Sequence, residues 1–332
     1  MGQVHNMKTI AITGIGGFIG MQMARRALAL GWTVQGMDVA PAGVQRARAA
    51  GARVEQGDIN DRDVLARAFA GADVVFHTAA VVQEDGPREL YERVNNEGTR
   101  SVCETAMATG VRRLVHLSSV MVYGFDYPDN VTEDGPFDVA GNPYTETKLS
   151  SERIALSFNN PAQGFGVMVI RPGDVYGMGS VPWVHRPLDA LKKHMFALPS
   201  NRRGVINHVH VDNLIDAVFL LIQKDCCGES FNVTDDVATP CHVFFGYLAK
   251  MTRRRIILLP TGLMQAGLSV AEKLLPMVGK QPLMQPAVIK FLERRHQVSC
   301  ARAKDRLGYA PVISLEQGMH QLEAELRASR LI

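Results

Sequence analysis

The stretch AITGIGGFIGMQMA, residues 11–24, decides the fold of this chain. It begins as a short apolar run, passes through four glycines within residues 14–20 and continues into helix-forming residues. Gly14, Gly17 and Gly20 have the spacing G-x-x-G-x-x-G. Glycine at such positions permits a tight turn, lets backbone N–H groups approach a pyrophosphate and brings helix and strand close together. The stretch therefore predicts a strand-turn-helix unit that binds a nucleotide.

The first half of the chain repeats this alternation of apolar runs and helical patterns. The predicted strands are KTIAITG (8–14), WTVQGMD (32–38), ARVEQGD (52–58), ADVVFHTAA (72–80), RLVHLSS (113–119) and FGVMVIRPG (165–173). Helical patterns lie between them at 17–30, 61–69, 92–109 and 143–157. Nearly continuous apolar strands that alternate with helices predict an α/β fold, with a doubly wound parallel sheet covered on both faces.

The pattern changes after Pro172. Helical segments at 183–193, 243–252, 261–278 and 286–293 outnumber clear strands, although residues 205–223 and 229–235 look like returns to the sheet. We expect a nucleotide-binding domain at residues 1–172, with returns near 205–235. Residues 173–332 are expected to form mainly a smaller, interleaved C-terminal lobe that binds substrate between the two parts.

Asp38 ends the second predicted strand, about 20 residues after the glycines. A carboxylate there accepts hydrogen bonds from a ribose 2′-OH and repels a 2′-phosphate. No arginine follows it before Arg46. The expected cofactor is therefore NAD rather than NADP.

Two further strand ends carry candidate cofactor contacts. Asp58 and Ile59 follow the third strand and could border the adenine, with Asp58 as hydrogen-bond acceptor, although Asp58 would serve equally well as a turn or N-cap residue. Ala79 and Ala80 end the fourth strand. They are small enough for a cofactor to lie over the sheet edge, or they serve packing alone.

Tyr144 and Lys148 stand four residues apart in a predicted helix and therefore share a face. A phenol is a poor base at neutral pH, and a nearby ammonium group favours the phenolate. Ser118 and Ser119 follow the fifth strand at the carboxyl edge of the sheet, where such folds bind ligands. A serine hydroxyl there could hold a substrate oxygen beside Tyr144.

These motifs together resemble those of the extended short-chain dehydrogenases/reductases, the NAD-dependent epimerase/dehydratase superfamily. The resemblance rests on TGIGGFIG, Asp38, HTAA, VNNEGT, LSSVMVYG, YTETK and RPGDVYG, which occur in the expected order along nearly the whole chain. It implies that Ser119 orients the substrate oxygen, Tyr144 is the acid/base, and Lys148 contacts the ribose and tunes the pKa of Tyr144. The cofactor-binding residues it implies are Gly14, Gly17, Phe18, Ile19, Gly20, Asp38, Asp58, Ile59, Ala79, Ala80, Asn95, Tyr144, Lys148 and Pro172.

Two features help to decide which branch of this superfamily the chain resembles. The tail HQVSCARAKDRLGYAPVISLEQGMHQL (296–322) resembles the C-terminal end of 3β-hydroxysteroid and sterol-4-carboxylate dehydrogenases, although nucleotide-sugar epimerases end comparably. Sugar-nucleotide enzymes of this type generally place an arginine four residues before the position of His210 to clamp a diphosphate. Ile206 stands there in this chain, although Arg202, Arg203 or Arg294 could substitute.

The expected activity is NAD-dependent hydride transfer to or from a secondary alcohol or ketone of a hydrophobic, steroid-like substrate. The apolar residues 258–278 would suit a ring system or an alkyl chain, or would serve ordinary packing. One alternative is an NAD-dependent nucleotide-sugar epimerase or dehydratase. A second is a non-catalytic NAD-sensing protein, which we disfavour because the chain keeps both Tyr144 and Lys148.

Composition limits the possible partners. With 46% apolar residues and a net charge of +3, the 332-residue chain predicts a small-molecule enzyme without a nucleic-acid footprint. Five cysteines without a CxxC pair indicate a reduced, cytoplasmic protein. Residues 262–278 are interrupted by charges and a proline, so they could lie on a membrane without crossing it.

We also expect a homodimer that pairs helices 92–109 and 143–157, as in proteins that this chain resembles. No metal site is expected, and four histidines are expected to be structural. They are His77, His116, His208 and His210. Tyr123 and Tyr176 are expected to wall the site.

Overall fold

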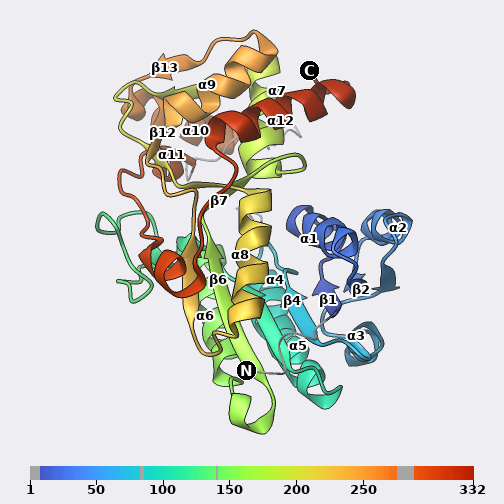
Figure 1. The fold of residues 1–332 in the computed structure, drawn as a ribbon. Helices are drawn as coiled ribbons and strands as arrows, with labels where there is room; N and C mark the ends of the chain where they lie inside the picture. The colour runs from blue at the N-terminus through green and yellow to red at the C-terminus, as the bar shows by residue number, and fades with distance from the viewer. Residues whose placement is uncertain (1–7, 83–85, 140, 275–287) are drawn as a thin grey trace.

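A seven-stranded sheet forms the centre of the molecule (Figure 1). The computed structural model describes residues 8–82, 86–139, 141–274 and 288–332. The strand order is β11-β6-β5-β4-β1-β2-β3, and every neighbouring pair is parallel. The strands are β1 (Thr9–Thr13), β2 (Thr33–Asp38), β3 (Arg53–Gln56), β4 (Val74–His77), β5 (Arg113–Leu117), β6 (Gly166–Pro172) and β11 (Ser230–Val233). The predicted α/β fold with a parallel sheet is confirmed.

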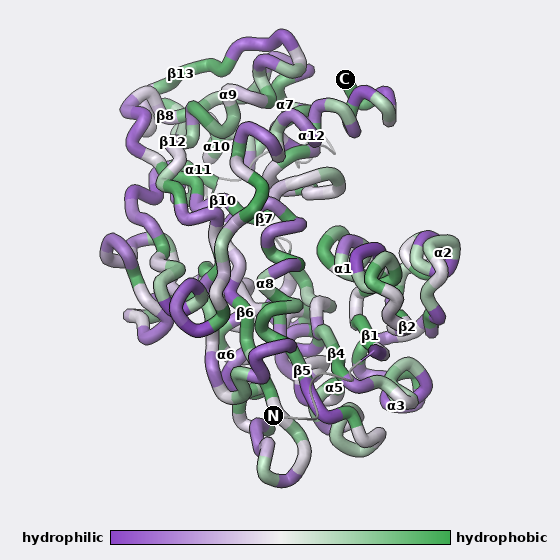
Figure 2. Tube along the Cα trace, viewed as in Figure 1, coloured by the Kyte–Doolittle hydropathy of each residue, from purple (hydrophilic) through white to green (hydrophobic). Residues whose placement is uncertain are grey.

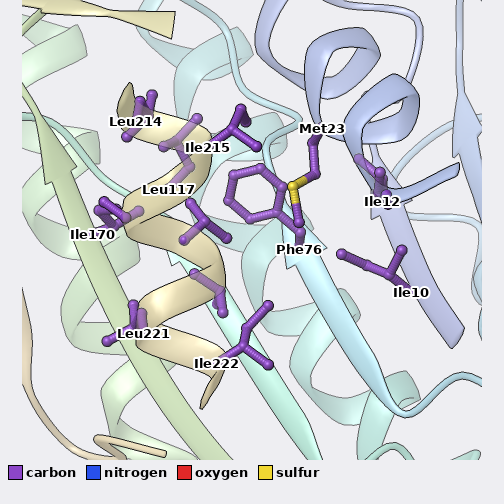
Figure 3. Packing of buried hydrophobic residues seen from close by; sticks show 14 of the residues in the cluster. Ile10, Ile12, Met23, Phe76, Leu117, Ile170, Leu214, Ile215, Leu221 and Ile222 are labelled. Atoms are coloured by element: carbon purple, nitrogen blue, oxygen red, sulfur yellow. The ribbon is translucent and has the colours of Figure 1, made fainter. Parts of the chain in front are cut away.

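Helices cover both faces of this sheet because its strands are apolar on both sides. Ile10 and Ile12 of β1 pack into one hydrophobic core, whereas Ala11 between them packs into the other. The first core receives α1 (Phe18–Ala29), α2 (Pro41–Ala49) and α8 (Val211–Lys224), and Figure 3 shows α8 against the sheet. The second receives α3 (Arg62–Phe69), α5 (Gly98–Ala108) and α6 (Pro143–Ser157). Two short elements, α4 (Arg88–Tyr91) and η2 (Glu92–Glu97), lead into α5.

A smaller lobe with its own hydrophobic core is built mainly from residues after Pro172. Its helical elements are η5 (Val181–His185), α7 (Arg186–Lys192), α9 (Cys241–Thr252), α10 (Thr261–Leu274), α11 (Val288–Leu292) and α12 (Leu315–Ala328). Three two-stranded sheets accompany them: β7 (Asp174–Tyr176) with β10 (His208–His210), β9 (Val205–Ile206) with β12 (Thr239–Pro240), and β8 (Ala197–Pro199) with β13 (Ile257–Leu259). Parts of the predicted helices 261–278 and 286–293 lie outside the described residues.

One of the two predicted returns to the sheet is wrong. Residues 230–233 do join the sheet, as its edge strand β11. Residues 205–223 instead form β9, β10 and the covering helix α8. The apolar side of α8 recurs at helical spacing, so it covers a face of the sheet and cannot extend it.

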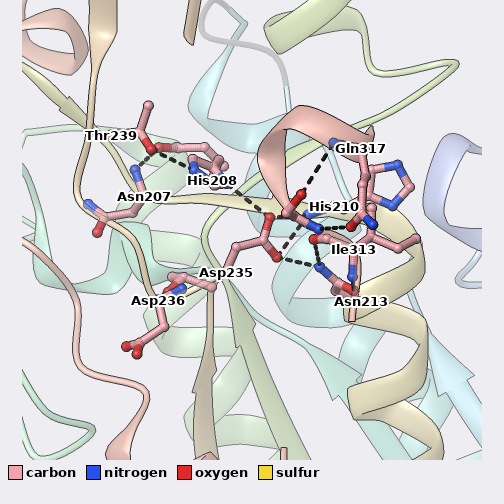
Figure 4. A network of polar contacts seen from close by, with 12 residues as sticks. Asn207, His208, His210, Asn213, Asp235, Asp236, Thr239, Ile313 and Gln317 are labelled. Carbon is pink, nitrogen blue, oxygen red and sulfur yellow. Dashed lines mark hydrogen bonds and ion pairs between the residues drawn. The ribbon is translucent and has the colours of Figure 1, made fainter. Parts of the chain in front are cut away.

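A buried polar network holds the interleaved segments together (Figure 4). The Asp235 carboxylate contacts His208 Nδ1 at 2.9 Å and accepts a hydrogen bond from Asn213 Nδ2 at 2.7 Å. The same amide group donates to the Ile313 carbonyl at 2.8 Å, just before α12. Segments about 100 residues apart in sequence are thereby joined where α8 begins.

Candidate active site

The glycine-rich turn lies between β1 and α1. Gly14 has a φ of +66°, and a Cβ atom on it would lie 3.0 Å from the Ala79 Cα atom. A Cβ atom on Gly20 would lie 2.4 Å from the Gly14 carbonyl oxygen. Gly17 is the N-cap of α1 and supplies no side-chain cap. The turn is therefore tight, and the first N–H groups of α1 have no capping side chain.

Asp38 lies at the end of β2, directly beside this turn. Its carboxylate accepts hydrogen bonds from the backbone N–H groups of Gly16 and Ala40, both at 2.8 Å. Arg46 of α2 also reaches the turn, because its guanidinium donates to the Gly16 carbonyl at 2.8 Å. The sequence did not show this proximity, since Arg46 follows Asp38 by eight residues and approaches through the fold of α2.

The other strand-end candidates have different surroundings. Asp58 is partly exposed, accepts hydrogen bonds from Arg93 and the Asn60 N–H, and has a lowered pKa chiefly because of Arg93. Ile59 is buried in the core that includes α3 and α5. Ala79 lies against Gly14. Ala80 is partly buried and follows Ala79 directly.

The residues named only through the family resemblance also occupy distinct places. Phe18 begins α1, and its ring lies next to Gly177 and Gly179, which follow β7. Ile19 packs partly into the core beneath α1, and Pro172 is buried at the end of β6. Phe18 therefore links the glycine turn to the lobe, a contact the sequence did not indicate.

His77 connects the glycine turn to Asn95. Thr13 Oγ1 accepts backbone hydrogen bonds from Thr78 and Ala79, so its own hydrogen points to His77 Nδ1, 2.7 Å away. His77 Nε2 must then carry the ring hydrogen, and it contacts Thr99 Oγ1 at 2.9 Å. Thr99 in turn donates to the Asn95 carbonyl at 2.6 Å. These contacts assign His77 as a neutral structural histidine, as expected.

The Asn95 side chain continues this connection. Its Oδ1 accepts the Val81 N–H at 2.7 Å, and its Nδ2 donates to Thr147 Oγ1 at 3.0 Å. Asn95 is buried within the π-helical turn η2, a backbone form often found at functional sites. It therefore ties the loop after β4 to α6.

Acid should destabilise the protein through His77. Burial lowers its folded-state pKa to about 3, with Lys148 contributing. As the pH falls below about 6.5, the unfolded chain binds a proton that the folded chain excludes, so the free energy of unfolding falls by about 1.4 kcal/mol per pH unit from this group. We expect a His77→Asn variant to show a shallower loss of stability than the wild type in urea titrations between roughly pH 7 and pH 4.

The matched control is His320→Asn, because the side chain of His320 is 72% exposed. This variant should keep the wild-type dependence on pH. Equal slopes for the wild type and His77→Asn would contradict the prediction.

Ser119, Tyr144 and Lys148 come together at the carboxyl edge of the sheet. Ser119 caps the short helix η3 (Val120–Tyr123), and its Oγ accepts the Met121 N–H at 3.1 Å. Tyr144 lies in the first turn of α6, whose N-cap Asn142 accepts the Tyr144 N–H at 3.0 Å. The Ser119 side chain lies close enough to the Tyr144 hydroxyl to lower its pKa. The neighbouring Ser118 Oγ is buried without a hydrogen-bond partner.

The expected lowering of the Tyr144 pKa is not found in this structure. Burial raises the pKa of Tyr144, and the hydrogen bond with Ser119 opposes that rise only in part. Lys148 is buried and donates to the Leu117 carbonyl at 2.6 Å, and burial lowers its pKa to about 8. The ammonium group is thus directed to the end of β5 and does not offset the desolvation of the phenol.

A buried ion pair in the same region was not singled out from the sequence. Arg294 donates to Asp174 Oδ2 at 2.6 Å, and the Arg294 side chain has no exposed surface. The pair is linked to the candidate site, because Arg294 contacts the Met121 sulfur at 3.7 Å and the Met121 backbone N–H donates to Ser119 Oγ. Burial is the largest cause of the raised Tyr144 pKa, and the Asp174 carboxylate raises this pKa further. The sequence suggests Arg294 only as a substitute diphosphate clamp.

Aromatic rings surround the Arg294 guanidinium. It lies 6.0 Å from the centre of the Trp183 ring and 5.4 Å from that of Phe291. The Phe291 ring packs edge-on against Phe125 at 4.8 Å, and Trp183 stacks with Phe245 at 6.4 Å. An aromatic cluster from separate segments of the lobe and the sheet edge therefore flanks the ion pair.

Tyr123 and Tyr176 do not wall the site. Both are fully buried. The Tyr123 hydroxyl is held by Asn232 and Arg171, at 2.7 Å each, and Arg171 in turn pairs with Glu152. Tyr176 packs among the rings of the lobe core. The "VYG" pattern places a tyrosine after a strand but does not reveal which side of the chain is solvent-facing.

Ile206 and the two remaining candidates for a diphosphate clamp, Arg202 and Arg203, also have clear positions. Ile206 is buried in the lobe core, and Arg202 and Arg203 are exposed on the loop before β9. His116, His208 and His210 are buried among protein groups. Among the described residues, no group of three or more His, Cys, Asp or Glu side chains is arranged to hold a metal ion.

Residues 10–234 match the model of the "NAD dependent epimerase/dehydratase family". This chain belongs to that family. Human sterol-4-alpha-carboxylate 3-dehydrogenase, decarboxylating, is 28% identical over 347 residues, covering 99% of this chain and 91% of the relative. The 3-beta-hydroxysteroid dehydrogenase of Mycolicibacterium neoaurum is 27% identical, covering 93% of this chain and 89% of the relative.

A solved structure of "MoeE5 in complex with UDP-glucose and NAD" has the same fold as this epimerase/dehydratase family member. It superposes with a TM-score of 0.77 at 22% identity, covering 97% of this chain and 99% of that chain. The predicted family, its relation to sterol and 3β-hydroxysteroid dehydrogenases, its enzymatic character and its NAD dependence are confirmed. Within the described residues, no helix has the length and apolarity needed to span a bilayer.

Proposed function

We propose that this family member transfers a hydride between NAD and a secondary alcohol or ketone of an uncharged, apolar, steroid-like substrate. Ser119, Tyr144 and Lys148 are the proposed catalytic residues. The observation that carries the proposal is the juxtaposition of Ser119 and Tyr144 at the sheet edge, where the Ser119 side chain lowers the pKa of Tyr144, with Lys148 one helical turn away. NAD-dependent oxidoreductase chemistry belongs to the family, and the finer assignment is ours.

The glycine turn fits an NAD pyrophosphate. The close approaches at Gly14 and Gly20 leave no room for larger side chains, and the first turn of α1 has neither a capping side chain nor an acidic residue. A helix N-terminus of this kind attracts a negatively charged group. Asp38 beside the turn would accept the adenine ribose hydroxyls, and Asp58 and Ala79 would border the nucleoside.

The proposed chemistry is an acid/base step at Tyr144. When bound, NAD supplies the hydride acceptor or donor at its nicotinamide ring. In oxidation, the Tyr144 phenolate removes the proton from the substrate hydroxyl while Ser119 holds the substrate oxygen. In reduction, Tyr144 returns that proton. Lys148, on the same face of α6, would contact the nicotinamide ribose.

The Asp174–Arg294 pair supports an uncharged substrate. A guanidinium binds a diphosphate through charge-assisted hydrogen bonds, but Asp174 already neutralises Arg294 and occupies one of its donors. Ile206 offers no alternative clamp, because it is apolar and buried. The aromatic cluster beside the pair suits a ring system, and two relatives carry steroid or sterol names.

The test combines turnover with nucleotide binding. Purified protein is assayed for NADH formation with a panel of 3β-hydroxysteroids, with and without a C4 carboxylate, and for thermal stabilisation by UDP- and GDP-sugars. We expect NADH formation with an uncharged steroid and no stabilisation by the nucleotide sugars. Stabilisation by one nucleotide sugar without net NADH would replace the proposal with an epimerase or dehydratase.

The assembly, compartment and domain division stay predictions. We propose a cytoplasmic homodimer that pairs η2 and α5 with α6, and a functional boundary near residue 172. Sedimentation of the purified protein tests the dimer, because a monomer at micromolar concentration would contradict it.

A further inference from the structure

One edge of the lobe exposes a set of large apolar side chains. Among the described residues, strand β13 pairs with β8 alone, and its Ile257 and Leu258 are exposed. Met195 lies beside them, because Ile257 N–H donates to the carbonyl of Phe196, the next residue. Helix α10 begins directly afterwards, and its Leu263, Val270 and Leu274 are each more than half exposed. We call these six residues the distal apolar edge.

Helix α10 is apolar over a wider sector than the lobe core covers. Met264 is buried in that core, and Leu268 packs against it. Leu263, Val270 and Leu274 recur at spacings of seven and four residues, which places them together on a neighbouring face. The polar side chains of the helix, such as Gln265, Ser269 and Glu272, occupy the remaining sector. Within the described residues, the lobe core therefore covers Met264 and Leu268 but leaves Leu263, Val270 and Leu274 more than half exposed.

Positive charge accompanies the distal apolar edge. Residues 250–274 contain five basic residues and one acidic residue, a net charge of +4, whereas the whole chain carries +3. Arg253, Arg254 and Arg255 are exposed and immediately precede β13, and Lys192 and Lys193 are exposed just before Met195. Figure 2 shows the hydrophobic strand β13 in green and the hydrophilic segment that leads into it in purple.

The acidic residues nearby do not cancel this charge. Glu272 lies on the polar sector of α10. Glu293 accepts a hydrogen bond from Thr261 Oγ1 at 2.7 Å and another from Asn201 Nδ2 at 2.9 Å. The edge thus combines exposed apolar side chains with a net positive flank.

We propose that the distal apolar edge docks on the surface of an anionic lipid bilayer. Leucine and valine side chains of an interfacial helix insert at the boundary between headgroups and acyl chains, while adjacent arginines pair with lipid phosphates. The combination of apolar area and positive charge fits such a surface better than a neutral bilayer or an anionic protein. This surface lies outside the proposed catalytic site, and its test involves no turnover.

The experiment is co-sedimentation of the full chain, loaded with NAD, with vesicles. One set is pure phosphatidylcholine, and the other contains about one third phosphatidylglycerol. We expect the protein to sediment with the anionic vesicles, and binding to weaken as salt screens the lipid charge. An Arg253→Gln/Arg254→Gln/Arg255→Gln variant should bind these vesicles about 100-fold more weakly.

Apolar insertion is tested separately. Leu263→Gln/Val270→Gln should lower binding about 10-fold or more, since both side chains are exposed and carry the apolar contact. The matched control Leu30→Gln/Val312→Gln alters two side chains elsewhere that are also more than half exposed, and it should leave binding unchanged. NAD affinity confirms that each variant is folded.

Three outcomes would overturn the proposal. In the first, the wild type does not sediment with anionic vesicles. In the second, the control pair Leu30→Gln/Val312→Gln weakens binding as much as Leu263→Gln/Val270→Gln does. In the third, the wild type self-associates in solution and the Leu263→Gln/Val270→Gln variant forms a smaller assembly, which would assign the edge to a second copy of the chain.

Discussion

Replacing Tyr144 with phenylalanine is expected to lower kcat/KM by roughly a thousandfold or more while leaving the Kd for NAD nearly unchanged. The substitution removes only the hydroxyl beside Ser119 and leaves the ring in the first turn of α6. No other described tyrosine combines that contact with a lysine one turn along the helix. Turnover is measured by NADH formation with the most active steroid of the panel, and NAD binding by calorimetry.

Tyr247→Phe is the matched control for this prediction. Tyr247 is partly buried against the lobe core on α9, so the same chemical change there should leave kcat/KM within about twofold. Retained turnover in Tyr144→Phe would remove Tyr144 from the mechanism, and loss of NAD binding would assign it a cofactor role instead.

Replacing Asp38 with serine is expected to shift the ratio of kcat/KM values from NAD toward NADP by roughly 100-fold. The substitution removes a carboxylate that would repel a 2′-phosphate, and the Arg46 guanidinium is already held at the adjacent Gly16 carbonyl. Arg46 could then contact the phosphate directly. Initial rates with each cofactor give the ratio.

The Asp38→Ser/Arg46→Ala double variant separates the two contributions. If Arg46 supplies the new contact, the double variant should lose most of the gain with NADP. An unchanged cofactor ratio in Asp38→Ser would show that Asp38 does not face the ribose and serves only the backbone N–H groups of Gly16 and Ala40.

Sequence patterns predicted helices and strands correctly where neighbouring residues alone determine the element. Continuous apolar runs predicted the strands of a parallel sheet, and α6 has the predicted boundaries because Asn142 caps it and Pro143 begins it. Residues 205–223 were misassigned, because an apolar run of that length is compatible with a buried strand or a covering helix. Only packing against β5 and β6 distinguishes the two possibilities.

The candidate site was predicted unevenly for the same reason. Ser119 was predicted to lie beside Tyr144 because parallel folds bind ligands at the carboxyl edge of the sheet, and strand direction alone determines which edge that is. Asp174 and Arg294 were not paired from the sequence, because 120 residues separate them. Asp174 stands two residues after Pro172 in RPGDVYG, so its place near the sheet edge was the available signal.

The sequence by itself determined the strand-turn-helix unit at Gly14, Gly17 and Gly20 and the shared face of Tyr144 and Lys148, because both depend on backbone geometry over a few residues. Only the tertiary structure decided that Arg294 is neutralised and that burial raises the Tyr144 pKa. Desolvation and ion pairing depend on which distant groups close around a side chain. Those distances are set when the lobe packs onto the sheet, and no local pattern encodes them.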